Sequence, residues 1–173
     1  MKPMAWGKKL SPEEKEKLLK ICSNLKIEPD YLMACIAFET GETFSPSIES
    51  KSGSKALGLL QFMPTTAIAL GTTSEKLKKM SVLEQLDYVE KYFKPYANKI
   101  NTLSDLYMAI LWPAAIGKSH DFVLFDKNDK KYPKRYIQNR GLDFNKDGKI
   151  TLGETCKRIE EKLVKGKTKE FFG

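Results

Sequence analysis

The chain has 173 residues, of which 41% are hydrophobic and 30% are charged, a composition typical of one soluble globular domain. Lys and Arg number 30 against 22 Asp and Glu, and the resulting net charge of +8 favours a polyanionic partner. No nucleic-acid-binding motif accompanies this charge and the lysines are spread along the chain, so nucleic acid is not an expected partner. No apolar run has the length of a secretory signal or a membrane span, which predicts synthesis without a signal peptide.

The three cysteines, Cys22, Cys35 and Cys156, are odd in number and lack the spacing of a metal site. Cys22 and Cys35 fall among apolar helical residues, which indicates buried free thiols. This pattern is typical of a protein that folds in a reducing cytoplasm.

Helix signals dominate the first two thirds of the chain. Ser11-Pro12-Glu13-Glu14 combines a cap residue, a first-turn proline and a glutamate three positions after the serine, and therefore starts a helix. Pro29-Asp30 opens a second helix, which ends at Gly41. Similar cap and stop signals predict further helices over residues 64–70, 81–93 and 102–112, and a last one over residues 154–165.

Two stretches between these helices are rich in turn residues. Residues 42–60 read as a loop, and so do residues 117–132 apart from the apolar patch 122–125, which is either a strand or loop packed inward. The fold class predicted is mainly α, a compact helical domain with at most a small β-hairpin, covering residues 1–173 as a single domain.

A glutamate ends the most apolar of these helices. Glu39 follows the run Ala34-Cys35-Ile36-Ala37-Phe38, where a carboxylate is costly unless it is paired, solvated or used. Downstream come Phe44-Ser45-Pro46, the segment Gly58-Leu59-Leu60-Gln61, and the helix start Pro64-Thr65-Thr66-Ala67. In this order the elements resemble the catalytic region of soluble lytic transglycosylases and goose-type lysozymes (the SLT domain), which has Glu-Ser, Gly-Leu-Met-Gln and Pro-Thr-Ala.

The resemblance implies a lysozyme-like fold with a catalytic core over about residues 29–117 and Glu39 as the general acid. An apolar pocket raises the pKa of a glutamate, and Phe38, Phe44 and Phe62 are expected to form its walls. Gln61 and the backbone of residues 58–62 are expected to bind the N-acetyl groups of the sugar. The expected substrate-binding residues are Thr40, Phe44, Gly58, Leu60, Gln61, Phe62 and Trp112.

The chain departs from the family pattern in two places. Thr40 stands where serine is usual, which keeps the hydroxyl. The later Ala-Tyr-Asn-Ala-Gly-like stretch, whose tyrosine touches the catalytic glutamate in the family, is replaced by residues 108–117 without a tyrosine. Trp112, Tyr107 and Tyr132 are the candidates for that part.

The acidic residues separate two reaction types. An inverting hydrolase needs a second carboxylate to activate water, and residues 50–74 contain no Asp or Glu. We therefore expect a transglycosylase that cleaves the β-1,4 bond between N-acetylmuramic acid and N-acetylglucosamine and forms 1,6-anhydromuramic acid. A hydrolytic goose-type muramidase and an inactive calcium-dependent wall-binding module are the alternatives.

The resemblance also implies the biological setting. Variants of this kind resemble phage enzymes that lyse the host or pierce its wall. The expected partners are peptidoglycan strands and anionic wall or membrane, with the protein as a monomer. It would be made in the host cytoplasm and reach the wall through a holin, or travel in the virion.

A second motif lies near the end of the chain. The segment "DFNKDGKITLGE" matches the calcium-binding loop of EF-hands. Its expected ligands are Asp143, Asn145, Asp147, the carbonyl of Lys149 and Glu154. A structural calcium ion is favoured over a solvated acidic turn, and no second copy of the loop is found. No cofactor is expected for catalysis.

Overall fold

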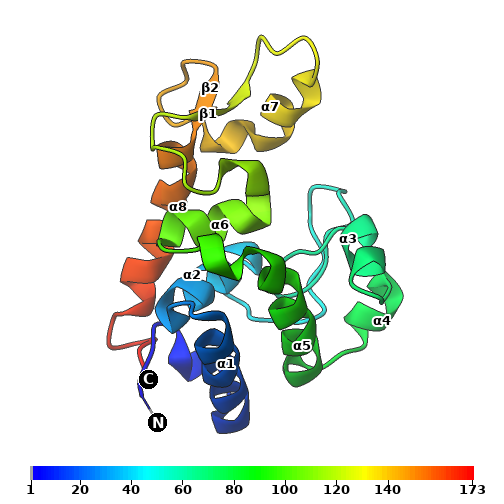
Figure 1. Cartoon of the computed structure of the whole chain (residues 1–173), viewed down its shortest axis with the longest axis vertical. Helices are drawn as coiled ribbons and strands as arrows, with labels where there is room; N and C mark the ends of the chain where they lie inside the picture. The colour runs from blue at the N-terminus through cyan, green and yellow to red at the C-terminus, as the bar shows by residue number, and fades with distance from the viewer. Residues whose placement is uncertain (1) are drawn as a thin grey trace. The chain divides into compact units, whose positions relative to one another are not determined.

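The computed structural model describes residues 2–173, which form two compact units. Unit 1 contains the described residues up to Asn98 together with Lys162–Gly173, and unit 2 contains Lys99–Glu161. The fold is mainly α, with eight α-helices and one two-stranded antiparallel sheet in the described chain (Figure 1). The boundary between the units falls inside the predicted catalytic core of residues 29–117.

Unit 1 is built almost entirely of helices. They are η1 (Gly7–Lys9), α1 (Pro12–Leu25), α2 (Pro29–Glu39), α3 (Pro64–Ala69), α4 (Ser74–Lys78), α5 (Val82–Phe93) and η2 (Lys94–Lys99), which runs to the boundary. Helix α1 packs against both α2 and α5, and α3 packs against α4. Helix α2 is buried over residues 32–37, so the apolar run before Glu39 is core.

Capping boxes start several helices where the sequence predicts them. Ser11 and Glu14 bond each other's backbone at the start of α1, and Ser81 and Glu84 do the same at α5. Each box satisfies backbone N–H groups that have no partner within the helix. These signals depend only on neighbouring residues, which is why they are readable from sequence.

The N-terminal segment of unit 1 is covered by residues 162–173. Trp6 donates its indole N–H to the Lys162 carbonyl (2.8 Å) and its ring lies 4.4 Å from that of Phe171. The backbones of Met4 and Gly173 exchange hydrogen bonds of 3.1 and 3.3 Å, so both ends of the described chain lie side by side (Figure 1). Trp6 is completely buried as a result.

Unit 2 carries the sheet. Its elements are α6 (Leu103–Leu111), η3 (Pro113–Ala115), β1 (Val123–Asp126), α7 (Pro133–Asn139), η4 (Arg140–Leu142), β2 (Lys149–Thr151) and α8 (Leu152–Gly166), whose last turn belongs to unit 1. Strand β1 covers residues 123–125 of the apolar patch 122–125, which the sequence predicts as either strand or loop, and it pairs antiparallel with β2. Helix α7 packs against both strands.

Two further features of the described residues bear on the sequence expectations. Cys22, Cys35 and Cys156 are buried, and none of them forms a disulfide. No helix within residues 2–173 has both the length and the apolar character needed to cross a membrane.

Candidate functional site

Glu39 is the last residue of α2, and the residues that precede it over positions 32–37 are buried in the core. Glu39 itself keeps part of its surface accessible, yet burial raises the pKa of its carboxyl to about 8. No ion pair with another described residue opposes this effect. The carboxyl is therefore protonated at neutral pH, which is the state that a general acid needs.

Tyr92, in unit 1, interacts electrostatically with Glu39. It lies on α5, and its pKa is raised to about 12 by burial and by the negative charges of Tyr96 and Glu39. Its ring centroid lies 5.5 Å from that of Phe62 and 6.0 Å from that of Tyr96. Sequence reasoning did not select Tyr92, because only the packing of α5 in unit 1 brings it near the glutamate.

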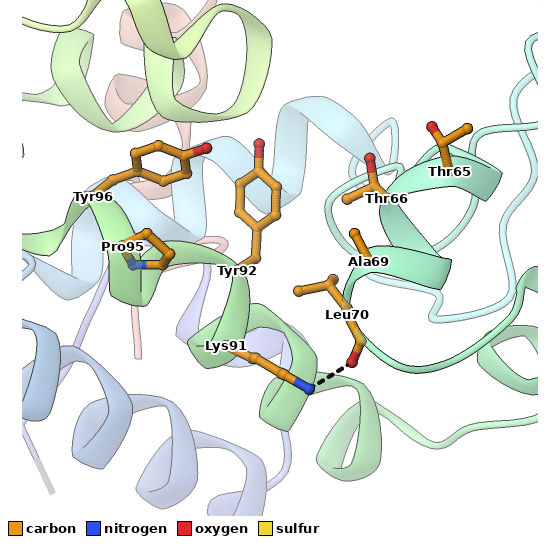
Figure 2. Close-up of a pocket in the computed structure, with 8 residues that line it drawn as sticks. All are labelled: Thr65, Thr66, Ala69, Leu70, Lys91, Tyr92, Pro95 and Tyr96. Atoms are coloured by element: carbon orange, nitrogen blue, oxygen red, sulfur yellow. Dashed lines mark hydrogen bonds between the residues drawn. The ribbon is translucent and has the colours of Figure 1, made fainter.

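A pocket opens beside Tyr92. It has a volume of about 380 Å³, within the usual range for small-molecule sites. Its lining residues are Thr65, Thr66, Ala69 and Leu70 from α3 and its C-terminal cap, with Lys91, Tyr92, Pro95 and Tyr96 from α5 and η2. Figure 2 shows the threonine hydroxyls on one side and the two tyrosines on the other. Hydroxyl groups beside aromatic rings suit a ligand that is itself rich in hydroxyls and apolar ring faces.

The two walls of this pocket are joined by a lysine. The ammonium of Lys91 donates a hydrogen bond to the carbonyl oxygen of Leu70 (2.7 Å), which Figure 2 shows. Because Leu70 caps the C-terminal end of α3, this bond satisfies a carbonyl that the helix itself leaves free. The bond thus ties α3 to α5.

The loop that carries Gly58 is held by a buried glutamine on α5. Gln85 accepts the Leu59 N–H (2.8 Å) and donates to the carbonyls of Pro46 (2.6 Å) and Leu77 (3.1 Å). Gly58 has φ 83°, and a Cβ at that position would lie 2.3 Å from the Gln85 amide oxygen. Gly58 is therefore needed for its lack of a side chain, and sequence reasoning missed Gln85 as its partner.

Gln61 is used by the same loop. Its amide nitrogen donates to the carbonyls of Ile48 and Gly58, both at 3.1 Å. The backbones of Leu57 and Phe62 exchange hydrogen bonds of 3.0 and 2.9 Å around it. Both amide hydrogens of Gln61 are thus bonded to backbone carbonyls of the turn. In this structure neither of them is free for the donation to a sugar that the sequence predicts.

Four other residues expected to bind sugar are buried. Thr40 is fully buried, and its hydroxyl donates to the Ile36 carbonyl and accepts the Phe44 N–H. Phe44 packs against Trp6 with ring centroids 5.9 Å apart, and Leu60 is only 2% exposed. These side chains shape the turn and the core; their direct contact with substrate stays a prediction. Phe62 is also buried and supports the ring of Tyr92 from within.

The two carboxylates that follow Glu39 in the chain are engaged elsewhere. Glu42 forms ion pairs with Lys162 and with Lys165, and these bonds outweigh burial and hold its pKa below the ordinary value. Glu49 pairs with Lys78 on the surface. Neither is left as a free base beside the pocket.

Trp112 belongs to unit 2. Its ring centroid lies 5.3 Å from that of Phe125, and the guanidinium of Arg135 lies 4.5 Å above it. The same guanidinium lies 3.7 Å from the ring of Tyr132, so it is held between two aromatic faces. Tyr107, a second candidate for the family tyrosine, is buried on α6.

The predicted calcium loop also lies in unit 2. Asp143 accepts hydrogen bonds from the Tyr136 hydroxyl (2.6 Å) and the Gly148 N–H (3.0 Å). The bond from Tyr136 holds the pKa of Asp143 below its usual range, so this carboxyl is ionised at neutral pH. Within residues 2–173, no three His, Cys, Asp or Glu side chains already converge as a metal-binding group.

No protein-family model matches the chain, and no curated protein matches it. Functional assignment of the chain therefore depends on the geometry around Glu39 and on the loop of unit 2.

Proposed function

We propose that the chain is a peptidoglycan lytic transglycosylase of the SLT type, with Glu39 as its acid and base. The observation that carries the proposal is the position of Glu39 at the end of a core helix, where burial raises the pKa of its carboxyl to about 8. A water-exposed glutamate is ionised at neutral pH and has no proton to donate. Glu39 retains its proton and is still partly accessible.

The proposed reaction uses the Glu39 carboxyl twice, first as an acid and then, as the carboxylate, as a base. Glu39 protonates the oxygen that leaves with N-acetylglucosamine, and the bond from that oxygen to C1 of N-acetylmuramic acid breaks. The C6 hydroxyl of the same muramic acid then bonds to C1 and returns its proton to the Glu39 carboxylate. The products are a free 4-hydroxyl and a 1,6-anhydromuramic acid, and no water is consumed.

The surrounding acids favour this route over hydrolysis. An inverting hydrolase holds a second carboxylate about 6.5–9.5 Å from the acid to activate water. Glu42 and Glu49 are both paired with lysines, and residues 50–74 contain no other acid. The substrate's own hydroxyl is therefore the better nucleophile.

The charge and the pocket agree with a wall polymer as substrate. A net charge of +8 attracts anionic wall and membrane, and the hydroxyl-lined pocket beside Tyr92 suits one sugar ring. We place the enzyme in phage lysis or wall penetration, acting after holin-type release or from the virion, as a monomer.

The test is the chemistry of the cleaved ends. Purified peptidoglycan is digested with the wild type, Glu39→Gln and the control Glu49→Gln, and the fragments are reduced with borohydride before mass spectrometry. We expect muropeptides that lack one water and resist reduction, with at least about a hundredfold loss of product for Glu39→Gln. Glu49→Gln should digest as the wild type does.

The other outcomes identify the alternatives. Fragments with reducible muramic acid ends would make the protein a hydrolytic muramidase. Binding to peptidoglycan without any release of fragments would make it an inactive wall-binding module.

A further inference from the structure

The segment that joins η4 to the first turn of α8 has buried carboxylate oxygens without partners. Oδ1 of Asp143 and Oε1 of Glu154 are both buried and make no hydrogen bond within the described chain. Asp143 as a whole is only 8% exposed. Burying an ionised carboxylate oxygen without a partner is costly, so each marks a place where a cation or a donor belongs.

Both carboxylates are held in fixed orientations by their second oxygen. Oδ2 of Asp143 accepts the Tyr136 hydroxyl and the Gly148 N–H, at 2.6 and 3.0 Å. Oε2 of Glu154 accepts the N–H and the hydroxyl of Thr151, at 2.9 and 3.0 Å. The unpartnered oxygens are therefore fixed by their neighbours and are not free to rotate into water.

The backbone between them has the curvature of a cation-binding loop. Lys146 and Gly148 have φ of 57° and 85°, which turns the chain back on itself. Gly148 is covered by Lys127, whose side chain would lie 2.3 Å from a Cβ at that position. Strand β2 then pairs with β1, and α8 leaves the loop directly after Thr151 (Figure 1).

The exposed middle of the loop is satisfied locally. Oδ1 of Asn145 accepts the Asp147 N–H at 3.0 Å, and Oδ1 of Asp147 accepts the Lys149 N–H at 2.8 Å. Both side chains lie in water and can turn without disturbing the core. The two ends of the loop are thus fixed and its centre is adaptable.

From these contacts we infer that residues 143–154 bind one calcium ion. Asp143 and Glu154 supply the buried carboxylate oxygens, Asn145 and Asp147 turn toward the ion, and the Lys149 carbonyl together with water completes an all-oxygen shell. Calcium accepts six to eight such ligands in flexible geometry, whereas magnesium requires a smaller, nearly ideal octahedron. The site is therefore selective for calcium, and calcium binding here is independent of the proposed enzymatic activity.

The ion also fixes the joint between the sheet and α8. Its two buried ligands lie on either side of β2, one before the strand and one in the first turn of α8. Binding to the folded state alone stabilises it in proportion to the logarithm of ligand excess over Kd. Calcium should consequently slow the opening of β2 and the start of α8.

The test measures binding and stability on the full chain. Protein stripped with EGTA is titrated with calcium chloride and with magnesium chloride by calorimetry, and its melting temperature is recorded in calcium and in EGTA. We expect one calcium per chain, a higher melting temperature in calcium, and at least about tenfold weaker binding of magnesium. Asp143→Asn and Glu154→Gln should each weaken calcium binding by at least about tenfold, while Glu160→Gln, outside the loop on α8, should not.

Terbium gives a second readout that needs no unfolding. Because the Tyr136 hydroxyl lies 2.6 Å from Asp143, excitation of this ring should sensitise luminescence from a bound terbium ion. Calcium should quench the signal by competition, and Tyr136→Leu should abolish it without abolishing the heat of calcium binding. Equal melting temperatures in calcium and EGTA, or calcium binding unchanged in both ligand variants, would overturn the inference and leave the loop as an acidic turn.

Discussion

Glu39 owes its chemistry to its position at the end of a core helix. Most glutamates of the chain lie in water, but this one follows the buried residues 32–37 and has its pKa raised to about 8 by burial. A side chain that keeps its proton in the folded state and loses it in the unfolded state links stability to pH. Glu39 therefore has a measurable effect on stability that is independent of catalysis.

Replacing Glu39 by glutamine should stabilise the protein increasingly as pH rises. Below about pH 4.5 the carboxyl is protonated in both states, so wild type and Glu39→Gln should differ little. Between about pH 4.5 and about pH 8, Glu39 loses its proton in the unfolded state but keeps it in the folded state, so the stability of the wild type falls as pH rises. The variant has no carboxyl at this position and does not lose this stability. The melting temperature of the variant, measured by calorimetry, should rise relative to that of the wild type from about pH 5 to about pH 8.

A matched variant separates burial from simple loss of charge. Glu49→Gln removes a carboxylate that is exposed and paired only with Lys78. Its melting temperature should follow that of the wild type at every pH. If the difference in melting temperature between Glu39→Gln and the wild type stayed constant with pH, the Glu39 carboxyl would not be desolvated.

At the scale of elements, α5 organises the candidate site from two of its residues. Tyr92 borders the pocket, and Gln85 holds the loop that leads to α3. Because Gln85 satisfies three backbone groups at once, it acts as a single link between α5, α4 and the loop. The capping box at Ser81 fixes where this helix begins.

Gln85→Leu should cost far more stability than loss of the nearby cap. It leaves the Leu59 N–H and the carbonyls of Pro46 and Leu77 without their partner, at roughly 3 kcal/mol or more in total. Ser81→Ala removes one capping bond and should cost about 1 kcal/mol. Urea unfolding of both variants gives the comparison, and equal midpoints would show that solvent replaces Gln85 without loss.

The sequence predicted the parts of the fold that local chemistry determines. The helix starts at Ser11, Ser81 and Thr102 were correct because a cap and its glutamate or aspartate lie three residues apart. The short helices α4 and α7 were missed. The mainly α fold with a small sheet was confirmed.

The site was less accessible to such reasoning. Glu39 was selected because an acid after an apolar run is unusual, but Tyr92 approaches it only through packing within unit 1. Gln61 and Thr40 were expected at the substrate, yet both direct their hydrogen bonds to the backbone. A polar side chain in a motif does not reveal whether it faces a ligand or its own loop.

At the scale of the whole molecule, unit 1 is discontinuous in sequence. Residues 162–173 return to it after unit 2 has been completed, and they cover Trp6. Gly166 is part of this contact, because a Cβ there would lie 2.3 Å from the indole ring. The first and last segments of the described chain thus share one hydrophobic contact.

Trp6→Ala should destabilise the protein by about 3–5 kcal/mol, since it empties a fully enclosed site. It should also free residues 167–173, which limited proteolysis detects as faster cleavage in that segment. Lys9→Ala removes only the cation over Phe171 and should leave both readouts near wild type. Unchanged proteolysis in Trp6→Ala would show that the segment is held by its backbone bonds alone.

Because residues 162–173 belong to unit 1, this unit cannot be completed before unit 2 has been synthesised. On the ribosome, the segment around Trp6 emerges long before the residues that cover it. Until Lys162 and Lys165 have been synthesised, Glu42 lacks both of its ion-pair partners. In a nascent chain, Trp6 is therefore exposed to chaperones and proteases until residues 162–173 have been translated.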